Sequence, residues 1–192
     1  MDTFSFVFSL YSIILGLALT EVLGGAARAN EERRRVRIGW PTGLLAGTLV
    51  ADITLFWRII WRAHSVIPDT SAALFAGVII CGLYYFAAVL TFPKEKPESA
   101  SLDDHFAAEK NKILSCIWFA NLCAYGCRVA LMGWGGSFAG WVWTDWSEVI
   151  AFMGSCAAAI FARDRRVLIV LIAIMLAADL VDPILSLIGI GS

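Results

Sequence analysis

Ionisable side chains lie inside stretches of this sequence that are otherwise apolar, and their types allow ion pairing, proton binding or cation binding. The segment 49–64, LVADITLFWRIIWRAH, carries Asp52, Arg58 and Arg62. A charged side chain deep in a membrane costs about 2.5–3.5 kcal/mol on insertion scales, so these charges need partners nearby. The other apolar stretches supply candidates: Glu21, Asn121, Arg128, Glu148, Asp179 and Asp182. We therefore predict a buried charged cluster, with Glu21 as the member that reaches toward the membrane surface.

Two features of this cluster predict specific chemistry. Arg58 and Arg128 lie too deep to extend their head groups to water, so each is expected to pair with an acid of the cluster. Asp179 and Asp182 precede Pro183, which cannot donate to the carbonyl of Asp179 and should kink the helix. The freed carbonyl beside two carboxylates is typical of a cation or proton site, while acids that only pair with arginines remain the alternative.

No catalytic or cofactor motif accompanies these residues. The sequence has no Gly-rich phosphate loop, no paired metal-binding His, and no nucleophile with a base at a known spacing. Its five Cys all lie in apolar stretches, where they are interpreted as small packing residues rather than a disulfide framework. We accordingly predict no metal and no cofactor, and nothing in the sequence supports an enzyme.

The composition is that of a polytopic membrane protein. Of the 192 residues, 59% are hydrophobic and 16% are charged, and the mean hydropathy is +0.76. A soluble domain has about 45–50% apolar and about 25% charged residues. The net charge of -1 provides no attraction to nucleic acid, so membrane lipids are the expected surroundings.

Six apolar stretches approach the ~20 residues that a helix needs to cross a bilayer. All should be helices, because backbone exposed to lipid must satisfy its own hydrogen bonds. They cover approximately 4–25, 41–63, 70–92, 112–133, 141–162 and 167–189. A helix that begins near Ser101 is expected to run without interruption into the fourth stretch. The sequence thus predicts one all-α transmembrane domain over 1–192, a bundle of six transmembrane helices.

Basic residues concentrate in alternate connections between these stretches. The first, third and fifth connections hold 12 of the 15 Lys and Arg, whereas the second and fourth hold none. The positive-inside rule then places the basic connections in the cytoplasm and both termini outside.

Small residues indicate where helices approach closely. They recur at four-residue spacing over 12–24 in the first predicted helix and over 43–51 in the second. Such stripes favour close packing in lipid, so we expect these two helices to be in contact. Trp57 and Trp61 point away from the arc that holds Asp52, which predicts that they face lipid. The stripes and the Trp-rich faces also predict a homo-oligomer, with a dimer as the first choice.

Four segments resemble a group of six-helix proteins of bacterial inner membranes. The segments are IILGLALTEVLGGAARA, VRIGW, FWRIIW and GLYYFAAVLTFP, the last followed by an acidic loop. The likeness covers roughly residues 1–120 and implies a multi-pass protein of the bacterial inner membrane. No activity is attached to that group, so the resemblance implies no mechanism.

Three functions remain open. Buried carboxylates beside Pro183 favour a small ion or proton channel or transporter, because ionisable groups inside a membrane often mark permeation paths. Short connections without motifs favour a non-catalytic subunit or scaffold of a membrane complex. A pocket open to lipid and lined by Asp52, Asp179 and Asp182 would favour an enzyme that modifies lipids.

Overall fold

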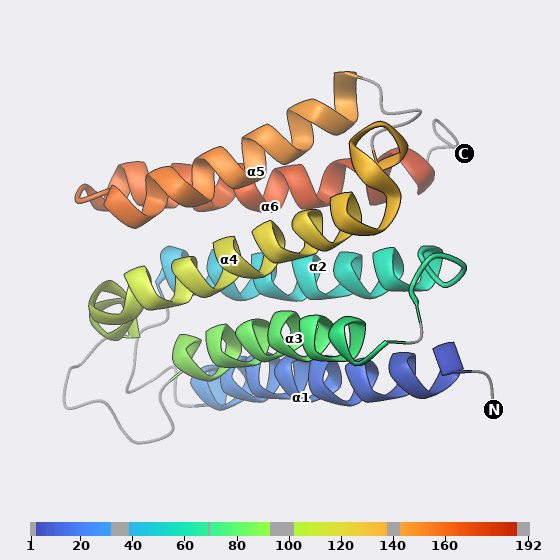
Figure 1. Cartoon of the computed structure of the whole chain (residues 1–192). Helices are drawn as coiled ribbons and strands as arrows, with labels where there is room; N and C mark the ends of the chain where they lie inside the picture. The colour runs from blue at the N-terminus through green and yellow to red at the C-terminus, as the bar shows by residue number, and fades with distance from the viewer. Residues whose placement is uncertain (1–2, 32–38, 69, 93–101, 138–142, 188–192) are drawn as a thin grey trace.

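Six helices form the part of the chain that the computed structural model describes, residues 3–31, 39–68, 70–92, 102–137 and 143–187. They are α1 (Thr3–Glu31), α2 (Trp40–Arg62), α3 (Ser71–Thr91), α4 (Leu102–Ser137), α5 (Trp143–Phe161) and α6 (Arg165–Leu187). Every regular element in these ranges is a helix, which confirms the predicted all-α class. Consecutive helices run in opposite directions along the bundle (Figure 1).

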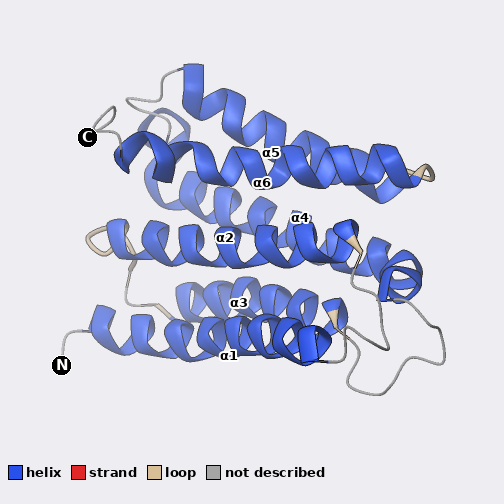
Figure 2. Ribbon diagram, turned by 180° about the vertical axis from the view of Figure 1, so that it is seen from behind, coloured by secondary structure: helices blue, strands red, loops and turns tan. Residues whose placement is uncertain are grey.

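The most extensive packing is between α3 and α4, α1 and α3, α5 and α6, and α2 and α6 (Figures 1 and 2). Helix α2 is central, because it contacts α1, α3, α4 and α6. Helices α1 and α6 both pack against α2 but, within the described residues, not against each other. The described chain starts and finishes at one end of the bundle, here called the terminal end. The opposite end, where α1, α3 and α5 finish, is called the basic end.

Five of the helices are long and apolar enough to cross a membrane: Phe4–Glu31, Trp40–Arg62, Ser71–Thr91, His105–Gly133 and Arg165–Leu187. Helix α5 is the exception, because its 19 residues carry Asp145, Ser147 and Glu148 in the first two turns. The predicted six helices are therefore present, and five of them have the character of membrane spans. These properties are those of an α-helical integral membrane protein.

Helix α4 confirms the prediction of one continuous helix that begins before the fourth apolar stretch. It starts at Leu102, and His105 near this start hydrogen-bonds the Leu90 carbonyl of α3 at 3.1 Å. Its regular geometry is interrupted at Gly133, where φ is 69°. Glycine adopts this left-handed conformation without the steric cost that a side chain would bring.

Two glycines allow α1 and α3 to approach closely. A Cβ on Gly77 would lie 2.0 Å from the ring of Tyr11, and one on Gly25 would lie 2.5 Å from Phe92. Tyr11 also donates its hydroxyl to the Ala73 carbonyl at 2.7 Å, which fixes the ring over Gly77. The α1–α3 interface therefore has no room for a methyl group at either glycine.

Helices α1 and α2 are in contact, as predicted, but not through the small-residue stripes. Gly47 of α2 faces Leu176 of α6, with 3.6 Å between a Cβ built there and the leucine, and Gly16 of α1 has no neighbour within 4 Å. Aromatic rings make contacts instead, such as Phe8 of α1 on Trp61 with 5.4 Å between centroids. Trp61 remains 60% exposed, in agreement with its predicted lipid-facing position.

Candidate functional site

A hydrogen-bonded group at the middle of α2 joins three helices. Asp52 is only 5% exposed, and the side-chain amide of Asn121 donates to its carboxylate at 2.9 Å. The same amide nitrogen lies 3.2 Å from the hydroxyl of Tyr84, a fully buried residue of α3. That hydroxyl is also within hydrogen-bonding reach of Asp52. Asp52 is thus held in one geometry by donors from α3 and α4.

Asp179 of α6 is the second buried acid, and unlike Asp52 it has a carboxylate oxygen without a hydrogen bond among the described residues. Its side chain is 8% exposed, and its Oδ2 atom is buried with no hydrogen-bond partner among the described residues. It interacts electrostatically with Asp52 and Glu148. Two buried carboxylates in mutual range repel each other when both are ionised, so a bound proton or cation stabilises the pair.

Pro183 lies inside α6, which continues beyond it to Leu187. Proline has no N–H group, so the backbone carbonyl of Asp179 lacks its helical donor, as the sequence predicted. A backbone oxygen without its usual donor therefore accompanies the unpartnered carboxylate oxygen on the same residue.

A second charged group lies closer to the terminal end. Arg58 of α2 forms an ion pair with Asp182 of α6, which confirms the pairing predicted for Arg58. Glu148 of α5 interacts electrostatically with both partners. The pairing predicted for Arg128 stays a prediction, although this residue lies in electrostatic range of Tyr125 on the same helix.

Two tyrosines, Tyr84 and Tyr125, complete the site. Tyr125 shares a face of α4 with Asn121 and interacts with acids of both groups, Asp52 and Asp179 in one and Glu148 in the other. Tyr84 was overlooked because a Tyr inside an apolar stretch is usually interpreted as an ordinary core residue. The available signal was its hydroxyl, since a buried Tyr hydroxyl usually needs a hydrogen-bond partner.

The predicted cluster is therefore brought together only in part. The structure assembles seven of the side chains discussed above, from five helices: Asp52, Arg58, Tyr84, Asn121, Glu148, Asp179 and Asp182. Glu21 is half-buried on α1, which within the described residues packs against α2 and α3.

The interior changes character between the two ends of the bundle. Toward the basic end from Asp52, apolar side chains of α2, α4 and α6 fill the space. Each of them is at most 6% exposed: Leu45, Leu49, Ile113, Leu114, Ile117, Leu168, Ile172 and Met175. We call these residues the apolar plug. The two buried acids thus lie beside the plug, and the partly exposed Arg58–Asp182 ion pair lies nearer the terminal end.

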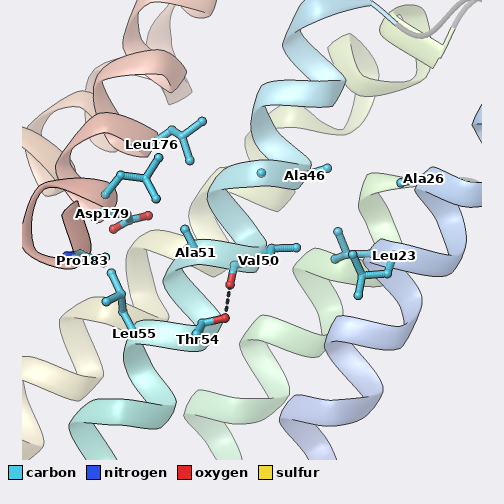
Figure 3. A pocket seen from close by; sticks show the side chains of 13 residues that line it. Leu23, Ala26, Ala46, Val50, Ala51, Thr54, Leu55, Leu176, Asp179 and Pro183 are labelled. Carbon is cyan, nitrogen blue, oxygen red and sulfur yellow. Dashed lines mark hydrogen bonds between the residues drawn. The ribbon is translucent and has the colours of Figure 1, made fainter. Parts of the chain in front are cut away.

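Asp179 also lines a lateral groove of about 530 Å³ that runs over α2 between α1 and α6 (Figure 3). The groove exists because α1 and α6 flank α2 without touching each other. Neither Asp52 nor Asp182 contributes to its lining. A lateral pocket, the feature that would favour a lipid-modifying enzyme, is thus present. Of the three acids expected to line it, Asp179 alone does so among the described residues.

Fold and site together define a class, the α-helical integral membrane proteins with a carboxylate pair buried among their spans. Comparisons with protein-family models, with curated proteins and with solved structures give no match to this chain. The resemblance to proteins of bacterial inner membranes stays a prediction, and the function is argued from the site itself.

Proposed function

We propose that this protein conducts or transports protons or small cations, and that Asp52 and Asp179 form its binding site. The observation that carries the proposal is the buried acid pair at mid-helix depth, one member of which has an unpartnered oxygen. Burial of an unsatisfied carboxylate is costly, so its presence in a core is accounted for by a ligand that binds there.

The surroundings of the pair support a path that reaches it from one side. Tyr125, Glu148 and the Arg58–Asp182 ion pair continue from the acid pair toward the terminal end. Hydroxyl and carboxylate groups in such a series can pass a proton between them. In the other direction the apolar plug excludes water, which is what a site accessible from one side at a time requires.

We place the protein in a bacterial inner membrane with its terminal end outside. Among the described residues, basic side chains cluster at the opposite end, including Arg28, Lys110, Arg163 and Arg166. By the positive-inside rule this end faces the cytoplasm. The binding site would then open to the outside, toward the higher proton concentration that such membranes maintain.

A second candidate is a non-catalytic subunit in which the charges only stabilise the bundle. The Arg58–Asp182 ion pair and the Asn121 bridge between Asp52 and Tyr84 favour it, because both fasten neighbouring helices together. It gives no reason for the unpartnered oxygen of Asp179, however, and we therefore rank it second.

Flux measurements in proteoliposomes test the proposal. The full chain is reconstituted with a pH-sensitive or Na⁺-sensitive dye inside, and a valinomycin-clamped K⁺ gradient provides the driving force. Asp52→Asn and Asp179→Asn remove one titratable group each and should each lower the flux at least tenfold. Asp164→Asn is the matched control, because Asp164 is exposed and asparagine can keep its cap on the Arg166 amide.

Two results would overturn the proposal. Folded wild-type protein that passes neither protons nor Na⁺ would leave the non-catalytic subunit as the better account. Unchanged flux in both folded Asn variants would show that ions cross elsewhere than at the acid pair.

A further inference from the structure

The lateral groove is lined almost entirely by apolar side chains. Gly47 and Ala51 of α2 form its floor, and their small side chains account for its depth. Its walls are leucine side chains of the flanking helices, Leu23 on α1 and Leu176 on α6. Its volume of about 530 Å³ falls in the range of about 300–1,000 Å³ typical of small-molecule pockets.

A single ionisable side chain, Asp179, lines this apolar space among the described residues. Figure 3 shows it on the α6 wall, facing α2 and across the groove from Leu23. Its buried Oδ2 has no hydrogen-bond partner in the part of the chain that the structure describes. The other polar lining residue is Thr54, whose hydroxyl donates to the Val50 carbonyl at 2.7 Å. The unsatisfied polar atom of the groove among the described residues is therefore a carboxylate oxygen, which carries a negative charge when Asp179 is ionised.

Among the described residues, no basic side chain lines the groove to neutralise that charge. Arg58 of α2 is paired with Asp182, and neither residue belongs to the groove lining. A ligand that completes the groove must therefore bring hydrocarbon surface and one positive charge together.

We propose that the groove binds a lipophilic organic cation that enters from the lipid, with its charge at Asp179. This goes beyond the proposed transport of protons or small cations, because Asp179 then also binds a ligand that enters from the lipid. Apolar walls bury the hydrocarbon of such a molecule, and the unpartnered carboxylate supplies the counter-charge. The ion pair gains strength because the low-dielectric walls exclude water.

Other occupants fit the groove less well. A neutral acyl chain would leave the Asp179 oxygen unsatisfied, and an anionic lipid head group would be repelled by it. A bare metal cation needs about six or more oxygen ligands, whereas the lining provides one carboxylate among apolar side chains. A cation with an apolar periphery can both pair with the Asp179 carboxylate and pack against the apolar side chains of the groove.

Calorimetry with a matched pair of probes tests this assignment. Tetraphenylphosphonium and tetraphenylborate have nearly the same size and shape and opposite charges. The full chain in detergent should bind the cation at least tenfold more tightly than the anion. Asp179→Asn should abolish this preference, while Asp164→Asn should preserve it. Ala51→Phe fills the floor without changing the charge and should weaken cation binding at least tenfold.

Each alternative has its own result. Equal binding of both probes, unchanged in Asp179→Asn, would mean that the groove holds hydrocarbon only and would overturn the inference. No binding of either probe would overturn it too, as would a wild-type preference for the cation retained by folded Asp179→Asn and Ala51→Phe proteins. Cation binding without ion flux in liposomes would refute the proposed transport and leave this inference standing. Ion flux that depends on Asp179, in a protein that does not bind the cation probe, would refute this inference and leave the proposed transport standing.

Discussion

The two buried aspartates should respond to the same substitution with opposite changes in stability. Asp179→Leu replaces a carboxylate that has an unpartnered buried oxygen with an apolar side chain of similar size, in an apolar groove. An unsatisfied buried polar group costs about 1–3 kcal/mol, so the free energy of unfolding should rise by about that amount. Asp52→Leu instead removes the acceptor of the Asn121 amide, 2.9 Å away, and should lower it by about 1–3 kcal/mol.

Thermal unfolding of the purified variants in detergent measures both changes. For a chain of this length, 1 kcal/mol corresponds to about 2–4 °C in Tm, so the expected shifts are about 2–12 °C in each direction. Asp164→Asn provides the baseline for loss of an exposed carboxylate, within about 0.5 kcal/mol. A fall in Tm for Asp179→Leu comparable to that for Asp52→Leu would mean that Asp179 is a structural residue, and the argument from its unpartnered oxygen would be refuted.

Three further predictions concern packing, topology and assembly. Gly77→Ala places a methyl group against Tyr11 and should lower stability by about 1–3 kcal/mol, whereas Gly82→Ala on the same helix meets no atom within 4 Å and should be neutral or mildly stabilising. In intact cells, a membrane-impermeant maleimide should label His64→Cys and leave Arg163→Cys unlabelled, and the reverse pattern would contradict the orientation. Native mass spectrometry from lipid nanodiscs should show a homodimer, and a monomer at all protein concentrations would disprove it.

The helices could be predicted from the sequence because membrane insertion makes strong demands on composition. A run of about 20 apolar residues has few alternatives to a helix in lipid, so the fold class and the continuous α4 were recoverable. The weaker case was α5, where Asp145 and Glu148 occupy the first turns of a short helix. Composition alone does not distinguish polar groups that face other helices from polar groups at a water-accessible end of a helix.

Contacts between helices were predicted less well than the helices themselves. Stripes of small residues predicted the α1–α2 interface, but the glycines in closest contact are Gly25 and Gly77, opposite large rings between α1 and α3. Close approach depends on which residue lies across the interface, and a single sequence does not contain that pairing. The Arg58–Asp182 ion pair was foreseeable because opposite charges at matching depth had few other partners.

For the proposed transport, the contrast between fixed Asp52 and unpartnered Asp179 also indicates which helix contact would open. Passage from Asp179 toward the basic end is closed by the apolar plug, so α6 has to move relative to α2. Movement near the terminal end would break the Arg58–Asp182 ion pair, whereas near Gly47 helix α2 presents no side chain and faces the apolar Leu176 of α6.

We therefore expect the half of α6 nearer the basic end to move during transport. In a background without the native cysteines, Gly47→Cys and Leu176→Cys joined by a short thiol cross-linker should hold this contact closed. Ion flux should then fall at least tenfold while each single-cysteine variant treated with the same reagent still conducts. Full flux through the cross-linked protein would show that α2 and α6 need not separate at Gly47, and the moving contact would have to lie elsewhere in the bundle.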